Sequence, residues 1–497
     1  MDLNVFIKET ISLKPLCDDE VHESKRSQTI ELSGLDRISP AILYTIFFYR
    51  PNQISCTTET NDYALAIERA KRALQRVLVS WFPAAGRLRT NPGTGKLEID
   101  CNEKGVAVIT AETCSKLEEL GKLHEYKACY EKLVRQLPDI GNISDSPLVV
   151  VQITKFSCGG ISIGFGGSHA LFDGFGAFNF LASWAHMSRS GKDSKTNDDH
   201  DQLMIIPNHS REKLLSATIS NAAATTTSGS SDGNNISSPK STASSSIFEQ
   251  DHIAAIQDLY GIPVQAVASD DGSWESELAK FGRIESQGLQ LLTLCMNKET
   301  VETWKGFAVQ SGELSKCSTF DALSAHVWKA RVKALALEPN ANICLQFPVD
   351  SRSRLQPPLG RNFTGNAFIL ASVSCSAKDL IEEPLRDTIR RIQAAKDTIT
   401  DEYIKLYVKA LECSSDKFFP SMRELTIVSD WLKFPFDALD FGWGKVSGAS
   451  LLGTPVPEAV FLMPNLEEPG NFLVRIGIGE QHVSDFISTF TTFDYPA

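Results

Sequence analysis

GGSHALFDGFG, residues 166–176, is the stretch that decides the fold of this 497-residue chain. It follows an alternating apolar segment, ISIGFGGS (161–168), and after Gly174 the pattern becomes helical. His169 and Asp173 therefore lie where a buried strand ends and a helix begins, a junction at which backbone N–H groups and side-chain tips can face a ligand. We interpret His169 as a candidate catalytic base; a packed core histidine is the competing interpretation.

Asp173 lies four residues after His169 and needs a positively charged or N–H partner, because a buried unpaired carboxylate is costly. Arg352 and Arg354, on the charged corner VDSRSR, are the available candidates. Glycines flank the histidine on both sides, at positions 164, 166, 167, 174 and 176. They remove side chains from the approach to His169, which suits close contact between the backbone and a ligand.

A second glycine-rich stretch, FPFDALDFGWGKV (434–446), interleaves aromatic residues with glycines. Trp443 stands between Gly442 and Gly444, three residues after Asp440. One interpretation is a bend capped by a core tryptophan. The other is a wall against which a flat or long ligand can lie.

Composition excludes several classes of protein. The formal net charge of −12 and a pI near 5.4 argue against a nucleic-acid-binding protein, which needs clustered Lys and Arg. The sequence contains no stretch of 18 or more apolar residues, so no membrane span is predicted. The first residues lack the apolar core of a signal peptide. The eleven cysteines are scattered without a C-x-x-C pair, which favours reduced thiols in the cytoplasm over disulfides or a zinc site.

The length of the chain predicts two domains rather than one. Between residues 216 and 246, sixteen of the 31 residues are Ser or Thr, a composition typical of a flexible surface linker. We therefore expect three parts: a front domain over 1–189, a crossover linker over 190–246 and a rear domain over 247–497.

Both halves mix helices with strands, so the chain is predicted to be α/β. In the front half, residues 64–82 carry apolar side chains at helical spacing: Ile67, Ala70, Leu74, Val77, Leu78 and Trp81. In the rear half, residues 318–335 are predicted to be a helix, with Ser318 and Asp321 forming a capping box at its start.

The two glycine-rich stretches match, in order, the two signatures of the plant BAHD acyltransferases. SHALFDG (168–174) resembles their HxxxDG signature, and DFGWG (440–444) resembles the second one. The resemblance spans almost the whole chain and includes ELSGLDR (31–37), WFPAAGRLR (81–89), STFDALSAHVWKAR (318–331), PVDSRSRLQPPL (348–359) and LVRIGIGEQHVSDF (473–486). FTGNAF (363–368) departs from the usual YFGN form, because Phe363 and Thr364 replace its two aromatic positions.

This resemblance implies two chloramphenicol-acetyltransferase-like domains, joined by a long crossover, with a solvent channel between them. It also implies transfer of an acyl group from a coenzyme A thioester to an alcohol or an amine. Acyl-CoA would then be a co-substrate, with no metal ion and no tightly held cofactor. We expect the protein to act as a monomer in the cytoplasm on a small-molecule acceptor.

The resemblance assigns roles to the residues that match its motifs. His169 becomes the general base, since a neutral imidazole can take a proton from the attacking hydroxyl or amine. The indole N–H of Trp443 is expected to help stabilise the oxyanion of the tetrahedral intermediate. Structural roles are expected for the remaining motif residues, Asp173, Gly174, Asp440, Gly442, Gly444, Arg352 and Arg354.

Coenzyme A carries phosphates, so its end of the channel should be locally basic despite the acidic composition. Lys316, Ser318 and Thr319 precede the predicted helix and are candidate contacts for phosphate or pantetheine. The same residues could simply cap that helix, and the sequence leaves both interpretations open.

Other functions were weighed on the same residues. A serine hydrolase with Ser168 as nucleophile lacks the G-x-S-x-G pattern, and a zinc enzyme lacks a second ligand near His169, since His186 is badly spaced. The glycine spacing also does not fit a dinucleotide fingerprint. A non-catalytic accessory protein that binds acyl-CoA is the alternative from another class. Substrates stay open: we expect a hydroxycinnamoyl or another aromatic or aliphatic acyl group and an alcohol acceptor, with an amine as the alternative.

Overall fold

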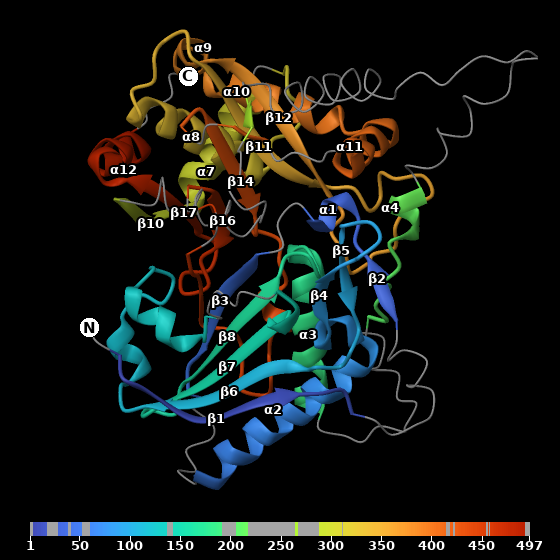
Figure 1. Cartoon of the computed structure of the whole chain (residues 1–497). Coiled ribbons are helices and arrows are strands. Elements are labelled where there is room, and N and C mark those ends of the chain that lie inside the picture. Colours follow the sequence, from blue (N-terminus) through green and yellow to red (C-terminus); the bar gives the residue numbers. More distant parts are fainter. Residues whose placement is uncertain are drawn as a thin grey trace, which may run out of the picture.

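The computed structural model describes most of the chain, namely residues 3–16, 28–37, 41–51, 60–136, 143–190, 205–216, 264–266, 288–310, 312–413, 418–420, 423–453, 456 and 458–492. From residue 217 onward, the Ser/Thr-rich part of the expected linker lies outside these residues. Figure 1 shows two α/β halves, one above the other, each built around a twisted sheet.

The front sheet holds six strands in the order β1-β6-β7-β8-β3-β15. Its strands are β1 (Val5–Leu13), β6 (Val106–Thr113), β7 (Val149–Phe156), β8 (Ile161–Ser168), β3 (Ile42–Tyr49) and β15 (Gly448–Leu451). Helices α2 (Thr60–Ser80) and α3 (Gly174–Ser190) cover one face (Figure 1). The predicted apolar stripe of the first helix is buried in the core, and the Trp184 indole of α3 donates to the Ala70 carbonyl of α2 at 2.8 Å.

The rear sheet also holds six strands, in the order β10-β17-β16-β14-β11-β12. Its strands are β10 (Leu289–Met296), β17 (Phe472–Gly479), β16 (Val460–Pro464), β14 (Leu425–Asp430), β11 (Asn342–Asp350) and β12 (Phe368–Ser376). Its helices are α7 (Lys298–Gln310), α8 (Thr319–Ala334), α9 (Ala377–Glu382), α10 (Leu385–Asp397), α11 (Asp401–Cys413) and α12 (Val483–Thr492). The capping box predicted for Ser318 and Asp321 is confirmed at the start of α8.

The front sheet includes a strand from the rear part of the sequence. Strand β15 comes from the rear part of the sequence, yet it pairs antiparallel with β3 and forms the edge of the front sheet. A separate small sheet, β2 (Thr29–Glu31), β5 (Leu97–Asp100) and β4 (Arg87–Thr90), lies beside the short helix α1 (Gly34–Arg37) (Figure 1). The other described elements are α4 (Glu212–Ser216), β9 (Val264–Ala266) and β13 (Phe418–Pro420).

Ion pairs join the halves on two sides. Glu412 of α11 accepts from Arg37 at 2.7 Å and from Lys96 at 2.8 Å. Glu467, on the loop between β16 and β17, lies 2.6 Å from Nδ1 of His124 and 3.5 Å from Arg50. These contacts fix the position of the rear half above the end of β8.

Candidate active site

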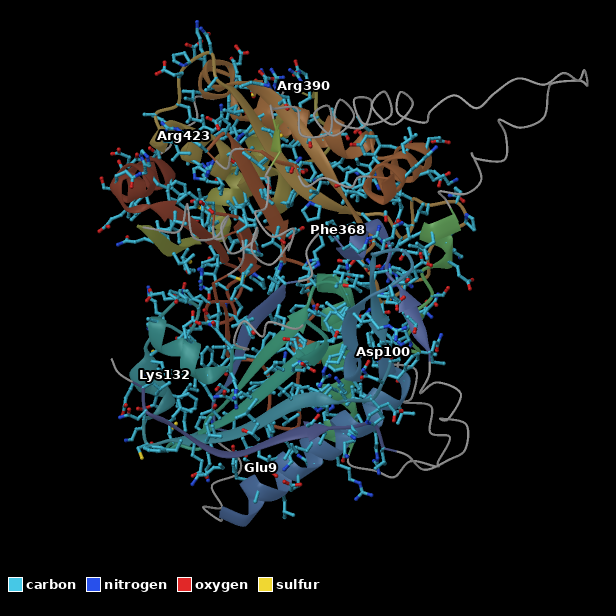
Figure 2. All side chains as sticks on the ribbon, viewed as in Figure 1. Glu9, Asp100, Lys132, Phe368, Arg390 and Arg423 are labelled. Carbon is cyan, nitrogen blue, oxygen red and sulfur yellow. The ribbon has the colours of Figure 1, made fainter. Side chains whose placement is uncertain are left out.

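His169 follows the last residue of β8 and is held by both halves. Its N–H donates to the Ala41 carbonyl of the front half at 2.9 Å, and its carbonyl accepts from Nδ2 of Asn366 at 2.7 Å. The imidazole is half-buried and meets the Phe368 ring edge-to-face, with 5.8 Å between centroids. Phe368 lies where the two halves meet (Figure 2). The histidine is therefore a residue of the junction between the halves.

A cavity of about 50 Å³ opens beside this imidazole. Most of its wall comes from three elements. Strands β3 and β8 each contribute every second residue, and α3 contributes residues from successive turns of one face. The lining residues are Leu43, Thr45, Phe47, Phe165, Gly167, His169, Phe172, Asp173, Gly174, Ala177, Phe178, Leu181 and Trp431. Apart from His169, only Thr45 and Asp173 bring polar side chains, so the cavity is an apolar slot with the histidine at one side.

The electrostatic environment of His169 favours the neutral imidazole. Burial lowers the pKa of His169 below its ordinary 6.5, because the charged form loses hydration. The Asp173 carboxylate, the residue's own carbonyl, the Asn366 side chain and the Asp36 carboxylate act in the opposite direction without offsetting burial. At neutral pH the ring is therefore unprotonated and able to accept a proton.

The Asp173 carboxylate is bound by Arg352. Oδ2 lies 2.9 Å from Nη1 and Oδ1 lies 3.0 Å from Nη2, a bidentate pair between side chains that are 8% and 4% exposed. The same carboxylate accepts from the N–H groups of Gly176 at 2.9 Å and Ala367 at 3.2 Å. Arg354, the other sequence candidate, instead donates to carbonyl groups at the end of α10. Asp173 thus ties the start of α3 to the rear half.

The glycines around His169 serve a different purpose from the one expected. A Cβ atom at each of them would lie within 3 Å of another protein atom: Leu133 at Gly164, Tyr44 at Gly166, Phe172 at Gly167, Phe434 at Gly174 and Thr364 at Gly176. Most of that space is filled by the protein itself, although Gly167 and Gly174 also line the cavity beside His169. The glycines allow strands and loops of the protein itself to approach closely.

Trp443 does not lie near His169. Its indole packs on Tyr49 at 5.6 Å and on Phe441 at 5.5 Å between centroids. Tyr49 pairs with Ile161, whereas Ile42, at the other end of β3, pairs with Ser168. Seven residues of strand separate those two ends, which is roughly 24 Å at the rise of an antiparallel strand. The expectation that Trp443 stabilises the oxyanion therefore fails on distance.

The DFGWG stretch is instead a loop that fastens the rear half to the far end of the front half. Oδ1 of Asp440 accepts from the N–H groups of Gly442 at 2.8 Å and Gly444 at 3.0 Å. Both glycines have φ of +94°, a conformation that side chains disfavour. Ser188, near the end of α3, donates to the Phe441 carbonyl at 3.1 Å. The core-tryptophan interpretation of this stretch fits the structure.

Replacing Trp443 by Phe tests this placement. The indole N–H is buried without a hydrogen-bond partner among the described residues, so its loss removes packing volume and no hydrogen bond. We expect the free energy of unfolding to fall by about 1–2 kcal/mol, as for other core truncations, with kcat within about twofold of wild type. Urea unfolding and steady-state kinetics measure the two effects. A hundredfold lower kcat at unchanged stability would contradict the placement.

Lys316, Ser318 and Thr319 lie at the start of α8 in the rear half. Ser318 accepts from the Asp321 N–H at 3.1 Å and donates its own N–H to the Asp321 carboxylate at 3.0 Å, so its hydroxyl caps the helix. Lys316 is exposed. Asp321 also pairs with Lys396. The Ser318 hydroxyl and the Asp321 carboxylate are therefore already engaged, in the helix cap and in this ion pair.

Several residues of the site were not predicted from the sequence. Leu43, Thr45 and Phe47 alternate along β3, and this alternation could have predicted that they share one face of the sheet, the face that lines the cavity. The positions 174, 177, 178 and 181 have the spacing of one helix face. Asp36 lies inside the quoted motif ELSGLDR (31–37), but no role was predicted for it, and nothing in the sequence pointed to Arg211.

Within the described residues, no group of three or more His, Cys, Asp or Glu side chains is arranged to hold a metal ion. Over the same residues, no helix combines the length and the apolar character needed to cross a membrane. Ser168, the nucleophile of the rival hydrolase interpretation, is 1% exposed inside β8.

Comparison with known proteins agrees with this architecture. The family model described as Transferase family matches residues 20–492. Brassinosteroid-related acyltransferase 1 of Arabidopsis thaliana is 36% identical over 475 residues, which are 94% of this chain and 94% of that protein. Omega-hydroxypalmitate O-feruloyl transferase of the same plant is 28% identical over 481 residues, 96% of this chain and 90% of that protein. The crystal structure of vinorine synthase matches with a TM-score of 0.67 at 18% identity over 99% of each chain, which shows the fold of two chloramphenicol-acetyltransferase-like domains.

Proposed function

The chain belongs to the Transferase family and is a BAHD acyltransferase, and on that premise we propose that it moves an acyl group from a coenzyme A thioester to a hydroxyl group of a small plant metabolite. His169 acts as the general base. Donor and acceptor are bound together, and no acyl-enzyme forms. The protein works as a monomer in the cytoplasm.

The proposed reaction needs one proton acceptor and no nucleophile from the enzyme, because a thioester is already activated. The acceptor hydroxyl attacks the thioester carbonyl as the His169 imidazole takes its proton. The tetrahedral intermediate then collapses, the carbon–sulfur bond breaks, and the imidazolium returns the proton to the leaving thiolate. The products are an ester and free coenzyme A, and the histidine is again neutral.

One observation carries this proposal: a half-buried histidine with a lowered pKa stands at the side of an apolar cavity where the two halves meet. A structural histidine in the core would be fully buried. His326 is such a residue, since it is 0% exposed and its Nε2 bonds the Phe490 carbonyl at 2.9 Å. The contrast between the two histidines supports a chemical role for His169.

The cavity supports an apolar acyl group. Its aromatic and aliphatic walls gain from covering apolar surface, whereas a free carboxylate there would lie buried without a matching cation. Arg352, the cation behind the cavity, is already paired with Asp173. Because the cavity is small, it favours a flat or linear group over a branched one. Hydroxycinnamoyl, benzoyl and medium-chain acyl groups fit this description, and malonyl does not.

For coenzyme A we propose the start of α8 as the contact region. Lys316 supplies an exposed positive charge, and the hydroxyl-bearing residues Ser318 and Thr319 stand where the helix N-terminus favours anions. The Ser318 hydroxyl accepts from the Asp321 N–H, so it can still donate its own hydrogen to an anion. This region is therefore assigned to the phosphate end of the donor.

The test is a matrix of acyl-CoA thioesters against alcohols and amines, read by release of free thiol and by product mass. We expect turnover with an aromatic or medium-chain donor and an alcohol, and little with malonyl-CoA. Preferred turnover of amines would move the assignment to an N-acyltransferase. If no pairing exceeds the rate of a His169→Ala control, the chain is an acyl-CoA-binding accessory protein instead.

A further inference from the structure

Part of the segment expected to be a flexible linker is packed against the active site. Residues 205–216 run beside the rear loop 363–366, and Asn208 forms a parallel bridge with Phe363. Arg211, just before α4, is only 3% exposed. A buried guanidinium needs a partner for each of its N–H groups, so its contacts show what it holds in place.

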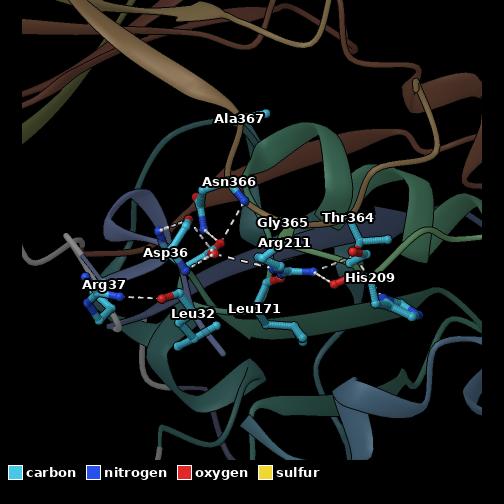
Figure 3. A network of polar contacts seen from close by, with 12 residues as sticks. Leu32, Asp36, Arg37, Leu171, His209, Arg211, Thr364, Gly365, Asn366 and Ala367 are labelled. Carbon is cyan, nitrogen blue, oxygen red and sulfur yellow. Dashed lines mark hydrogen bonds and ion pairs between the residues drawn. The ribbon is translucent and has the colours of Figure 1, made fainter. Parts of the chain in front are cut away.

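Arg211 contacts three segments that are far from it in the sequence, and also the His209 carbonyl of its own segment (Figure 3). Its Nε lies 3.4 Å from Oδ2 of Asp36. Nη1 of the guanidinium donates to the His209 carbonyl at 2.7 Å and to Oγ1 of Thr364 at 3.3 Å. Nη2 donates to the Leu171 carbonyl at 3.0 Å. Leu171 is two residues after His169, so this last bond anchors the loop that carries the candidate base.

Asp36 anchors the same loop by a second path. It is fully buried and accepts from Ser33, Arg211 and Asn366, the last through both its N–H and its Nδ2 at 2.9 Å. Nδ2 of Asn366 also donates to the His169 carbonyl at 2.7 Å. The carboxylate therefore orients the amide that holds the backbone of the histidine (Figure 3).

The rear loop is shaped to receive Arg211. A Cβ atom on Gly365 would lie 2.7 Å from the guanidinium carbon, so the guanidinium occupies the space that glycine leaves. Thr364 stands where the YFGN form has an aromatic residue. Its hydroxyl accepts from Arg211 and lies 2.8 Å from Nδ1 of His209. The departure from the usual motif thus coincides with a specific docking contact for the crossover.

We propose that Arg211, paired with Asp36 and docked through Thr364, is a positioning residue that holds the His169–Leu171 backbone in the geometry needed for proton transfer. It touches no reacting atom and acts through the loop. The inference rests on His169 being the base. If the wild-type chain shows no turnover with any substrate, the proposed function fails; if it turns over and the variants below behave like wild type, only this inference fails.

The experiment compares Arg211→Lys, Thr364→Val and Thr364→Ser in the full-length enzyme, with kcat and both KM values measured. Lysine keeps the positive charge but lacks the two-pronged guanidinium that bonds several partners at once. A shift of a catalytic loop by about 1 Å can lower the rate on the order of 100-fold. We therefore expect kcat of Arg211→Lys to fall about 10- to 100-fold. Thr364→Val removes the hydroxyl that contacts Arg211, His209 and the Asn208 carbonyl, and it should lower kcat by about 3- to 10-fold. Thr364→Ser restores the hydroxyl and should restore most of the rate. KM values should change by less than about twofold.

Lys213→Met is the matched control, because Lys213 lies on α4, two residues after Arg211, is exposed and donates to the Pro358 carbonyl at 2.9 Å. It should keep the wild-type kcat. Thermal unfolding and coenzyme A binding show whether each variant is folded. The inference is overturned if kcat per folded molecule is unchanged in the Arg211 and Thr364 variants, or if only the KM values rise. Should Arg211→Lys not fold, the difference between Thr364→Val and Thr364→Ser decides by itself.

Discussion

Replacement of His169 by alanine is expected to lower kcat by about 10²- to 10⁴-fold, the usual contribution of a general base. Its imidazole is the one titratable group in the cavity wall that is not already held in an ion pair, since Asp173 is bound by Arg352. Without it, the attacking hydroxyl must lose its proton to water. The measurement is single-turnover and steady-state acyl transfer with the best donor and acceptor from the substrate matrix.

Folding and donor binding should survive this substitution, because the backbone bonds of His169 to Ala41 and Asn366 do not involve the imidazole. Calorimetric binding of coenzyme A and a thermal unfolding curve check this. His482→Ala, on the short turn after β17 and outside the cavity wall, is the matched control and should keep the wild-type rate. Equal rates for His169→Ala and wild type would remove the proposed base.

The pH dependence gives a second readout on the same residue. The neutral imidazole is the active form, and its pKa is lowered by burial below the ordinary 6.5. The acid limb of kcat/KM should therefore have its midpoint below pH 6.5, and activity should be nearly constant from there to neutrality. The measurement uses an alcohol acceptor, because a hydroxyl group does not change its protonation state in this pH range, whereas an amine can. A midpoint at or above 6.5 would mean that the ring is more hydrated, or more strongly paired with Asp173, than the structure shows.

The second large effect is expected for Asp173→Asn. The amide keeps the shape of the carboxylate but removes the buried charge partner of the Arg352 guanidinium and leaves it the largely exposed Asp350 at 3.1 Å. Breaking a buried ion pair typically costs about 3–5 kcal/mol. Urea unfolding should report a loss of about that size. Acyl transfer should also fall, because the same carboxylate holds the N–H groups of Gly176 and Ala367, on opposite sides of the junction.

An exposed ion pair supplies the matched control for this prediction. Asp437 lies 3.2 Å from Lys445, and both side chains are about four-fifths exposed. Asp437→Asn is the same chemical change in a hydrated environment, where screening leaves little net stabilisation, so no measurable loss of stability is expected. Equal losses for the two variants would show that burial of the Asp173–Arg352 pair has no special role.

The sequence alone predicted the elements that carry their own signal. The apolar stripe from Ile67 to Trp81 is buried against the front sheet, and the capping box of Ser318 and Asp321 begins a helix. The strand-to-helix junction at His169 is present. Each of these features depends on residues within a few turns of one another, so side-chain spacing and local hydrogen bonding are sufficient to fix them.

Only the tertiary structure decided which distant residues meet. It selected Arg352 over Arg354 as the partner of Asp173, and it placed Trp443 at the opposite end of β3 from His169. It also brought Arg211, from a segment expected to be a flexible linker, against the catalytic loop. These outcomes depend on strand register and on the packing of one half against the other. Periodicity reports which face of an element is buried, but it carries no information on what covers that face, because the covering residue can lie hundreds of positions away.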